Sequence, residues 1–173
     1  ADVGRATVIG YEVGARMGAF LRIRPGMHVD GVWGAFGAAA AVVSLRGGDW
    51  AQVLRALQAC ATQLPFSLYQ PIRQGANVRN TYLAHSAWLG LQAAQWTCAG
   101  LAMPVGTVSE YRTLALDGAG HGHWPAPGQW LTLDSYWKPF AAVRHVHYGA
   151  QAALRLRAQW LAQGLRVVDI EEI

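Results

Sequence analysis

The chain has 173 residues, of which 53% are apolar and only 14% are charged, whereas soluble globular domains usually carry about 25% charged residues. This composition excludes an intrinsically disordered chain, and the length accommodates one domain and the beginning of a second. The net charge is +4, because thirteen arginines and one lysine outnumber ten acidic residues. Because these residues are scattered along the chain instead of forming a stripe, we expect no nucleic-acid partner.

Two amphipathic helices are predicted in the first part of the chain, at residues 5–23 and 50–64. Pro25 follows the first helix, and Asp49 is placed to cap the second. The side chains expected to face the core are Val8, Tyr11, Ala15, Gly18 and Leu21 in the first helix, and Val53, Leu54, Leu57, Ala61 and Leu64 in the second. The sequence therefore begins as an α-helical domain.

Between these two helices, glycine recurs at every third position, at Gly31, Gly34 and Gly37, and leads into the apolar run 38–43. A phosphate-binding loop would need a preceding strand, a different spacing and a lysine. We therefore expect a helix whose glycine face packs closely against another backbone.

Residues 81–109 contain no Asp, Glu, Lys or Arg, and Asn80 is placed to cap a long helix at their start. The expected inner face comprises Leu83, Ala87, Gly90, Leu91, Ala94, Cys98 and Leu101, with Trp88 and Trp96 on the other side. A helix that is apolar nearly all round belongs in the middle of a large body or at a subunit interface. His85 lies on this helix and is predicted to be a hydrogen-bonded interior side chain, not a catalyst.

The longest uncharged stretch, residues 80–109, is long enough to cross a bilayer, but polar side chains and Pro104 interrupt it. We therefore expect no membrane association. Because the N-terminus shows no secretory-signal pattern, the expected location is the cytoplasm. Cys60 and Cys98 lie far apart in the sequence and are predicted to be reduced, buried thiols.

The second part of the chain has a different pattern, which begins with turn-forming residues at 117–129, predicted to be an exposed loop or a domain boundary. Alternation of apolar and polar residues then predicts a short strand at 130–136. An amphipathic helix is predicted at 147–163, closed by Gly164. Its expected inner side chains are Ala150, Ala153, Leu154 and Leu161. The last residues, 165–173, are predicted to form a strand.

His121 and His123 form a His-x-His pair, which is able to hold a metal ion, but Asp117 as the nearest third ligand gives no recognisable metal-site spacing. We therefore predict no metal, and a metal-binding protein is the weakest alternative function. No G-x-S-x-G segment occurs, so hydrolase chemistry is not supported.

Three further segments carry a more specific pattern when they are taken in order along the chain. They are residues 26–37 (GMHVDGVWGAFG), residues 77–82 (NVRNTY), and residues 136–140 (YWKPF) followed by residues 144–147 (RHVH). Together they resemble the MmgE/PrpD family, and the resemblance is collinear over nearly the whole chain. That family includes 2-methylcitrate dehydratase, cis-aconitate decarboxylase and iminodisuccinate epimerase, which act on small polycarboxylates without a metal or an organic cofactor.

The resemblance implies a mainly α fold. Residues 1–129 are expected to be part of a multihelical domain, and residues 130–173 the beginning of a small α+β lid domain. Family members are considerably longer, so we expect either a fragment or a chain that a second polypeptide completes. The expected partners are a small polycarboxylate substrate and a second protein chain, either in a homodimer or as the source of the missing part of the fold.

The resemblance also implies a set of site residues. His28, Lys138 and His147 are the predicted catalytic residues, and Arg79 and Lys138 are predicted to bind substrate carboxylates. Removing a proton next to a carboxylate builds negative charge, which fixed cations stabilise, and a histidine near neutrality moves the proton. The predicted function is therefore a cofactor-independent lyase, either a dehydratase or a decarboxylase, acting on a small di- or tricarboxylate.

Several alternatives stay open on the sequence alone. An epimerase or isomerase of the same family uses the same proton transfer, and a truncated, non-catalytic module completed by a partner chain is a different class of function. His28 has the alternative role of closing its loop, and His147 that of a structural residue at a helix start. Arg79 stands where several family members have lysine, and Lys138 has the alternative of an ordinary solvated side chain.

Overall fold

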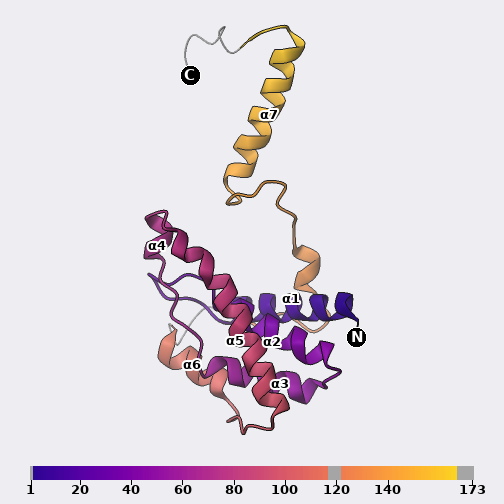
Figure 1. Cartoon of the computed structure of the whole chain (residues 1–173), viewed down its shortest axis with the longest axis vertical. Coiled ribbons are helices and arrows are strands. Elements are labelled where there is room, and N and C mark those ends of the chain that lie inside the picture. Colours follow the sequence, from indigo (N-terminus) through magenta and orange to yellow (C-terminus); the bar gives the residue numbers. More distant parts are fainter. Residues whose placement is uncertain (1, 117–121, 167–173) are drawn as a thin grey trace. The chain divides into compact units, whose positions relative to one another are not determined.

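The computed structural model describes residues 2–116 and 122–166, and the chain divides into two compact units, Ala1–Asp134 and Ser135–Ile173 (Figure 1). The helices of the first unit are α1 (Val3–Phe20), α2 (Trp33–Leu45), α3 (Trp50–Ala61), α4 (Gln70–Arg73), η1 (Asn77–Asn80), α5 (Thr81–Cys98), α6 (Thr107–Ala115) and η2 (Leu131–Asp134). The described residues form no strand. The predicted mainly α fold is therefore confirmed.

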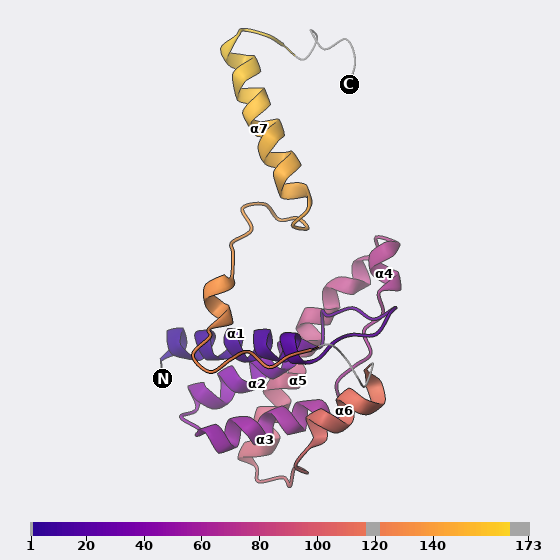
Figure 2. The same cartoon turned by 180° about the vertical axis from the view of Figure 1, so that it is seen from behind.

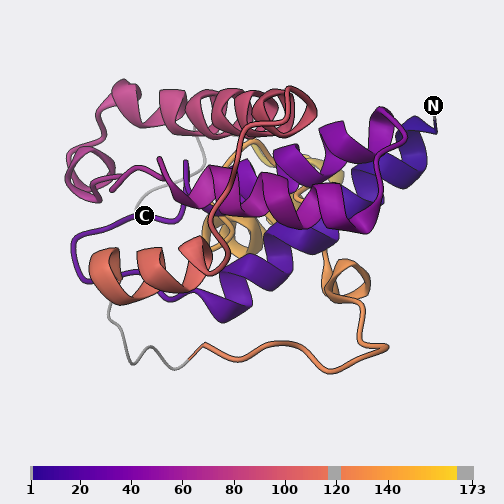
Figure 3. The same cartoon turned by 90° about the horizontal axis from the view of Figure 1, so that it is seen from below.

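The core of the first unit is built around α2, which packs against α1, α3 and α5, while α6 packs against α3. Figure 3 shows α2 between α1 on one side and α5 on the other. Phe36, Val32 and Val43 are almost completely shielded from solvent at this centre. A helix surrounded on three sides has no need of a polar face, which explains why α2 is apolar nearly throughout.

The predicted close packing of the glycine helix is confirmed. A Cβ atom added at Gly37 would lie 2.6 Å from the carbonyl oxygen of Gly10 in α1. A Cβ atom added at Gly34 would lie 2.8 Å from the hydroxyl of Ser86 in α5. Because such distances are too short for a real Cβ, glycine at these positions is what allows α1 and α5 to approach α2.

The helix predicted for residues 50–64 is confirmed in position, as α3, and so is its cap. The Asp49 carboxylate accepts from the backbone N–H of Gln52, and the Gln52 side chain accepts from the backbone N–H of Asp49, which completes a capping box. Val53 and Leu57 are buried as predicted, whereas Leu54 is 43% exposed.

The predicted inner face of α1 was partly wrong, although Leu21 at its C-terminal end is buried as predicted. Val8 and Tyr11 are 44% and 54% exposed. The buried positions are Ala6, Gly10, Glu12, Val13 and Met17. The close contact with α2 lies at Gly10, where a Cβ atom would be 2.8 Å from the carbonyl oxygen of Gly37.

The predicted inner face of α5 was also partly wrong. Leu83 is 58% exposed instead of buried, although Gly90 and Ala94 lie inside as expected. The buried residues are Ser86, Leu89, Gly90, Ala93, Ala94 and Thr97. A Cβ atom at Gly90 would lie 2.5 Å from the carbonyl oxygen of Ala35, so α5 approaches α2 closely at this glycine.

The strand predicted at 130–136 was wrong, because residues 131–134 form the 3-10 helix η2. The backbone N–H groups of Leu131 and Thr132 donate to the Glu12 carboxylate, at 3.1 and 2.8 Å, and the Thr132 hydroxyl also donates to it at 2.7 Å. Backbone donors that bind a buried carboxylate are not available to a neighbouring strand. The alternation of the sequence carries no sign of this distant acceptor.

The residues that lead to η2 run beside α1 (Figure 2). The backbone N–H of His123 donates to the carbonyl of Ala19, and Arg16 donates to the carbonyls of Pro125 and Gln129. Pro125 is almost fully buried. The part of the predicted 117–129 loop that the structure describes, residues 122–129, is therefore fastened to α1.

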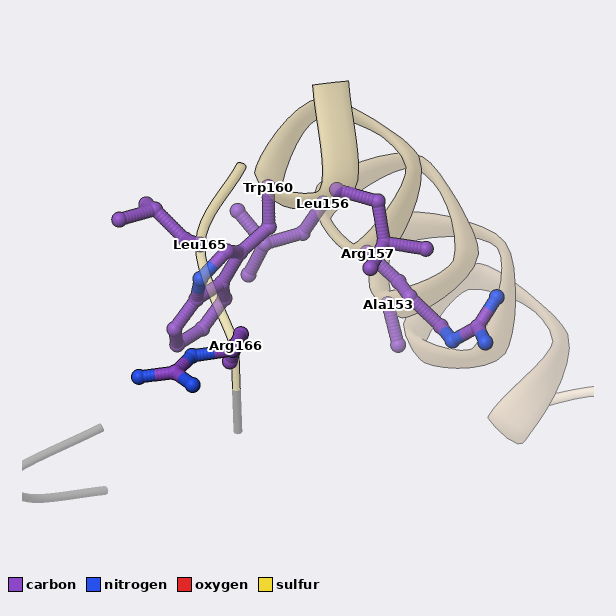
Figure 4. Close-up of a pocket in the computed structure, with 7 residues that line it drawn as sticks. Ala153, Leu156, Arg157, Trp160, Leu165 and Arg166 are labelled. Atoms are coloured by element: carbon purple, nitrogen blue, oxygen red, sulfur yellow. The ribbon is translucent and has the colours of Figure 1, made fainter. Parts of the chain in front are cut away.

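The second unit contains α7 (Val146–Ala162), which confirms the predicted helix to within one residue at each end. No residue of α7 is buried, and the expected inner residues Leu154 and Leu161 are 51% and 56% exposed, so the prediction of an inner face was wrong. Leu165 folds back towards Trp160 and helps to line a cavity of about 310 Å³ (Figure 4). Residues 167–173 of the predicted terminal strand lie outside the described residues.

The two cysteines differ. Cys60 is buried as predicted, and burial raises its pKa to about 12, whereas Cys98 is exposed, contrary to the prediction. Both are free thiols.

Within residues 2–116 and 122–166, no helix has the length and apolar character that crossing a membrane requires.

Candidate functional site

The loop that carries His28 is held by a second loop of the first unit. The backbone N–H of His28 donates to the carbonyl of Ser67 at 2.7 Å, and that of Tyr69 donates to the carbonyl of Gly26 at 2.8 Å. Met27 and Leu68 form an isolated antiparallel bridge between these bonds. The backbone at His28 is thus fixed on both sides.

The His28 ring is oriented by two contacts. Its Nδ1 accepts from the backbone N–H of Asp30 at 3.0 Å, and its face stacks on the Tyr69 ring, with centroids 5.6 Å apart and an interplanar angle of 24°. A nitrogen that accepts a hydrogen bond carries no proton, so the neutral ring has its proton on Nε2. In this hydrogen-bonding state Nε2 is a donor, and the lone pair of the ring lies on Nδ1.

Asp30 joins His28 to Arg79. Its Oδ2 accepts from Arg79 Nη2 at 3.1 Å and lies 3.6 Å from His28 Nδ1. The latter distance is too long for a strong hydrogen bond, and the backbone N–H of Asp30 already occupies Nδ1. The side chains of His28, Asp30 and Arg79 are 18%, 22% and 37% exposed, so all three are reachable from solvent while remaining partly shielded.

Gly31 places Asp30 against the start of α5. The backbone N–H of Val32 donates to the carbonyl of Val29, which closes a turn with Gly31 at its third position and a φ of +86°. A Cβ atom at Gly31 would lie 2.8 Å from the Ser67 hydroxyl and 3.2 Å from the carbonyl oxygen of Tyr82. Glycine therefore supplies both the backbone angle and the space that bring Asp30 within reach of Arg79.

Two cavities flank this cluster of His28, Asp30 and Arg79. Arg79 lines one of about 210 Å³ together with Asn77 and Asn80, and the guanidinium Nη1 donates to the Asn80 side chain at 3.3 Å. The other, of about 440 Å³, is lined by Ser67 of the supporting loop and by His85 of α5. His85 is exposed, so the prediction that it is an interior side chain was wrong.

In the second unit, Lys138 and His147 share one acceptor. Lys138 Nζ donates to the carbonyl of Ala142 at 3.4 Å, and His147 Nε2 lies 3.2 Å from the same oxygen. The Phe140 ring packs edge-to-face on His147 with centroids 5.4 Å apart. Lys138 is exposed and His147 is half-buried.

The structure therefore brings the predicted site residues together in two pairs, His28 with Arg79 and Lys138 with His147. Sequence reasoning missed Asp30, which makes the connection in the first pair. A carboxylate two residues after the candidate histidine and directly before a turn glycine was the available signal. The catalytic and binding roles of the four predicted residues remain predictions.

His121 of the candidate metal pair lies outside the described residues. Among residues 2–116 and 122–166, no three His, Cys, Asp or Glu side chains come together in a group that could hold a metal ion.

The fold and the first pair define a mainly α-helical protein with an imidazole, a carboxylate and a guanidinium in one partly exposed cluster. The sequence profile of the MmgE/PrpD N-terminal domain matches residues 1–116, which is more than half of the chain. The chain belongs to the MmgE/PrpD family, which includes dehydratases and related enzymes. No curated protein and no solved structure matched the chain.

Proposed function

We propose that this protein is a cofactor-independent lyase that acts on a small di- or tricarboxylate by moving a proton at the carbon next to a carboxylate. Family membership supports an enzyme of the dehydratase type in general. The cluster in the first unit supports the finer assignment, because it combines a proton-transfer group with a carboxylate-binding cation.

His28 is the proposed general acid and base. At rest Nδ1 accepts from the backbone N–H of Asp30 and Nε2 carries the proton, so Nε2 acts first as a donor. Nε2 takes a proton from carbon only when the ring carries its other proton on Nδ1, which lies 3.6 Å from Asp30 Oδ2. A positioned imidazole acting as general acid or base contributes about 10²–10⁴-fold to a rate.

Arg79 is the proposed carboxylate-binding residue of the first unit. Its Nη2 is engaged by Asp30, but more than a third of the side chain is exposed and it lines a cavity of about 210 Å³. Guanidinium groups bind carboxylates through two parallel N–H donors, and a bound cation also stabilises the negative charge that develops when the neighbouring proton leaves.

Lys138 and His147 complete the proposal in the roles that family resemblance assigns to them. Lys138 is a compact positive charge for a substrate carboxylate, and His147 supports it or donates a proton to the leaving group. Their shared contact with the Ala142 carbonyl supports treating them as one functional pair.

The observation that carries the proposal is the position of the His28 ring. Its Nδ1 accepts a hydrogen bond from the backbone N–H of Asp30, and Arg79 donates to the carboxylate of the same aspartate. The test measures the exchange of substrate C–H hydrogens with deuterium from the solvent. The purified protein is incubated in D₂O with lactate, malate or citrate, and proton NMR follows both the loss of C–H signals next to carboxylates and the appearance of unsaturated products.

The expected result is deuterium incorporation or elimination with at least one of these acids, reduced at least about 100-fold by His28→Asn. His123→Asn, which changes an exposed histidine of the 122–129 segment, is the matched control and should leave the rate unchanged. Exchange without net elimination would favour the epimerase alternative, and a His28→Asn variant as active as the wild type would overturn the role of His28.

A further inference from the structure

We propose that Asp30 is a positioning and specificity-determining residue, which orients His28 through its backbone and weakens the binding of a substrate with three carboxylates more than that of a substrate with two. This inference rests on the proposed function and narrows its substrate class. Asp30 performs the two tasks with different atoms, its backbone N–H and its carboxylate.

The positioning task depends on the backbone. The N–H of Asp30 donates to His28 Nδ1, and the turn closed by Val29 and Val32 fixes where that N–H points. Gly31 presses the turn against Ser67 and the first turn of α5. A donor held in this way keeps the His28 proton on Nε2 whatever side chain stands at position 30.

The specificity task depends on charge. With a neutral imidazole, Arg79 contributes one positive charge and Asp30 one negative charge, so the cluster has no net charge. An incoming carboxylate that approaches Arg79 also approaches the Asp30 carboxylate, which lies 3.1 Å from the same guanidinium. Repulsion from Asp30 acts on every charge of the ligand, and its cost therefore increases with the number of carboxylates.

A role in stability alone does not explain the Asp30–Arg79 ion pair equally well. Asp30 is 22% exposed and faces a cation that is itself 37% exposed, and such partly exposed ion pairs contribute little to stability. A carboxylate in this place has its largest effect on the potential that a ligand meets. Asp30 therefore weakens the binding of the most highly charged anions the most.

The experiment compares lactate, malate and citrate, three hydroxy acids with one, two and three carboxylates, in calorimetric titrations at fixed ionic strength. Asp30→Asn keeps the size and the backbone N–H but removes the charge. We expect this variant to bind citrate about tenfold more tightly than the wild type and lactate only about twofold more tightly, since the repulsion scales with ligand charge. Glu110→Gln removes the same charge from α6 and should change none of the three affinities.

The outcomes separate this inference from the proposed function. If the acids bind and exchange protons but Asp30→Asn changes all three affinities by the same factor, or not at all, the specificity role is overturned and the proposed function stands. If neither protein binds any of the acids, the proposed function fails and the specificity role fails with it.

The positioning role has its own measurement, which requires no substrate. Long-range proton–nitrogen NMR spectra at about pH 8, above the ordinary histidine pKa of about 6.5, identify the nitrogen of His28 that carries the proton. The expected result is an Nε2–H ring in both the wild type and Asp30→Asn. An Nδ1–H ring in the wild type would overturn the positioning role.

Discussion

Arg16 lies one helical turn after Glu12 in α1, and its Nε donates a 2.7 Å hydrogen bond to Glu12 Oε1. The two side chains bind opposite kinds of backbone group in the segment beside them. Glu12 binds backbone N–H groups at Leu131 and Thr132, and Arg16 binds backbone carbonyls such as that of Pro125. This one pair therefore fastens the end of the first unit to its first helix.

Replacing Glu12 by Gln should lower the free energy of unfolding by about 3 kcal/mol, because a buried ion pair is broken and charge-assisted hydrogen bonds are lost. Glu12 is only 5% exposed, so solvent does not compensate. Urea denaturation followed by circular dichroism measures the change. Glu110→Gln on exposed α6 is the matched control and should stay within about 0.5 kcal/mol of the wild type. Equal stability of the two variants would show that the pair does not fasten the segment.

The same carboxylate should make stability depend on pH in the acid range. Burial acts to raise the pKa of Glu12, but hydrogen bonds from Thr132, Leu131 and Arg16 outweigh it and lower the pKa from its ordinary value of 4.5. A lowered folded-state pKa contributes stability that is fully present above the unfolded value and is lost as the pH falls through the folded value. The free energy of unfolding should therefore fall below about pH 4.5, and fall less in Glu12→Gln. Identical slopes between pH 5 and 3 would contradict this prediction.

Two glycines one turn apart in α1 should respond oppositely to substitution by alanine. A Cβ atom at Gly10 would lie 2.8 Å from the carbonyl oxygen of Gly37, whereas one at Gly14 would lie 3.5 Å from its nearest neighbour, an ordinary contact. Gly10→Ala should destabilise the protein by about 2–3 kcal/mol through overpacking. Gly14→Ala should be neutral or stabilising by up to about 1 kcal/mol, because alanine favours the helix. Thermal unfolding of both variants measures the difference, and a Gly10→Ala variant as stable as Gly14→Ala would refute the close α1–α2 contact.

The two thiols should differ in reactivity. Burial raises the pKa of Cys60 to about 12, so almost no thiolate forms at pH 8, and its Sγ lies 3.5 Å from the carbonyl oxygen of Ala35 inside the core. Cys98 is exposed. A thiol-specific chromogenic reagent should therefore modify one cysteine in the native protein and two in denaturant, and Cys98→Ser should abolish the native reaction. Rapid native modification of both thiols would show that the α2–α3 contact opens readily.

Features that depend on neighbouring residues were predictable from the sequence. The cap at Asp49 and most of the helical stretches follow from periodicity and capping residues, although the first helix ends at Phe20 and not at the predicted residue 23. The glycine spacing between positions 31 and 37 likewise predicted close packing, and the three ordered motifs predicted the family. For the helices, the cap and the glycine spacing, the information lies within a few turns of chain, where local sterics and hydrogen bonding decide the outcome.

Features that depend on distant residues were not predictable from the sequence. Asp30 and Arg79 are 49 positions apart, and no sequence pattern in either segment indicates that the two side chains pair. Glu12 takes its backbone donors from residues 119 and 120 positions away, which turned a predicted strand into η2.

By itself, the sequence determined that this protein is mainly helical, where most of its helices lie, and which family it belongs to. Only the tertiary structure decided which face of α1 and α5 is buried, and that Asp30 joins His28 to Arg79. The physical reason is that hydrophobicity ranks residues one at a time. Burial in a close-packed helical body depends also on the space between two backbones, which at Gly90 leaves no room for a Cβ atom.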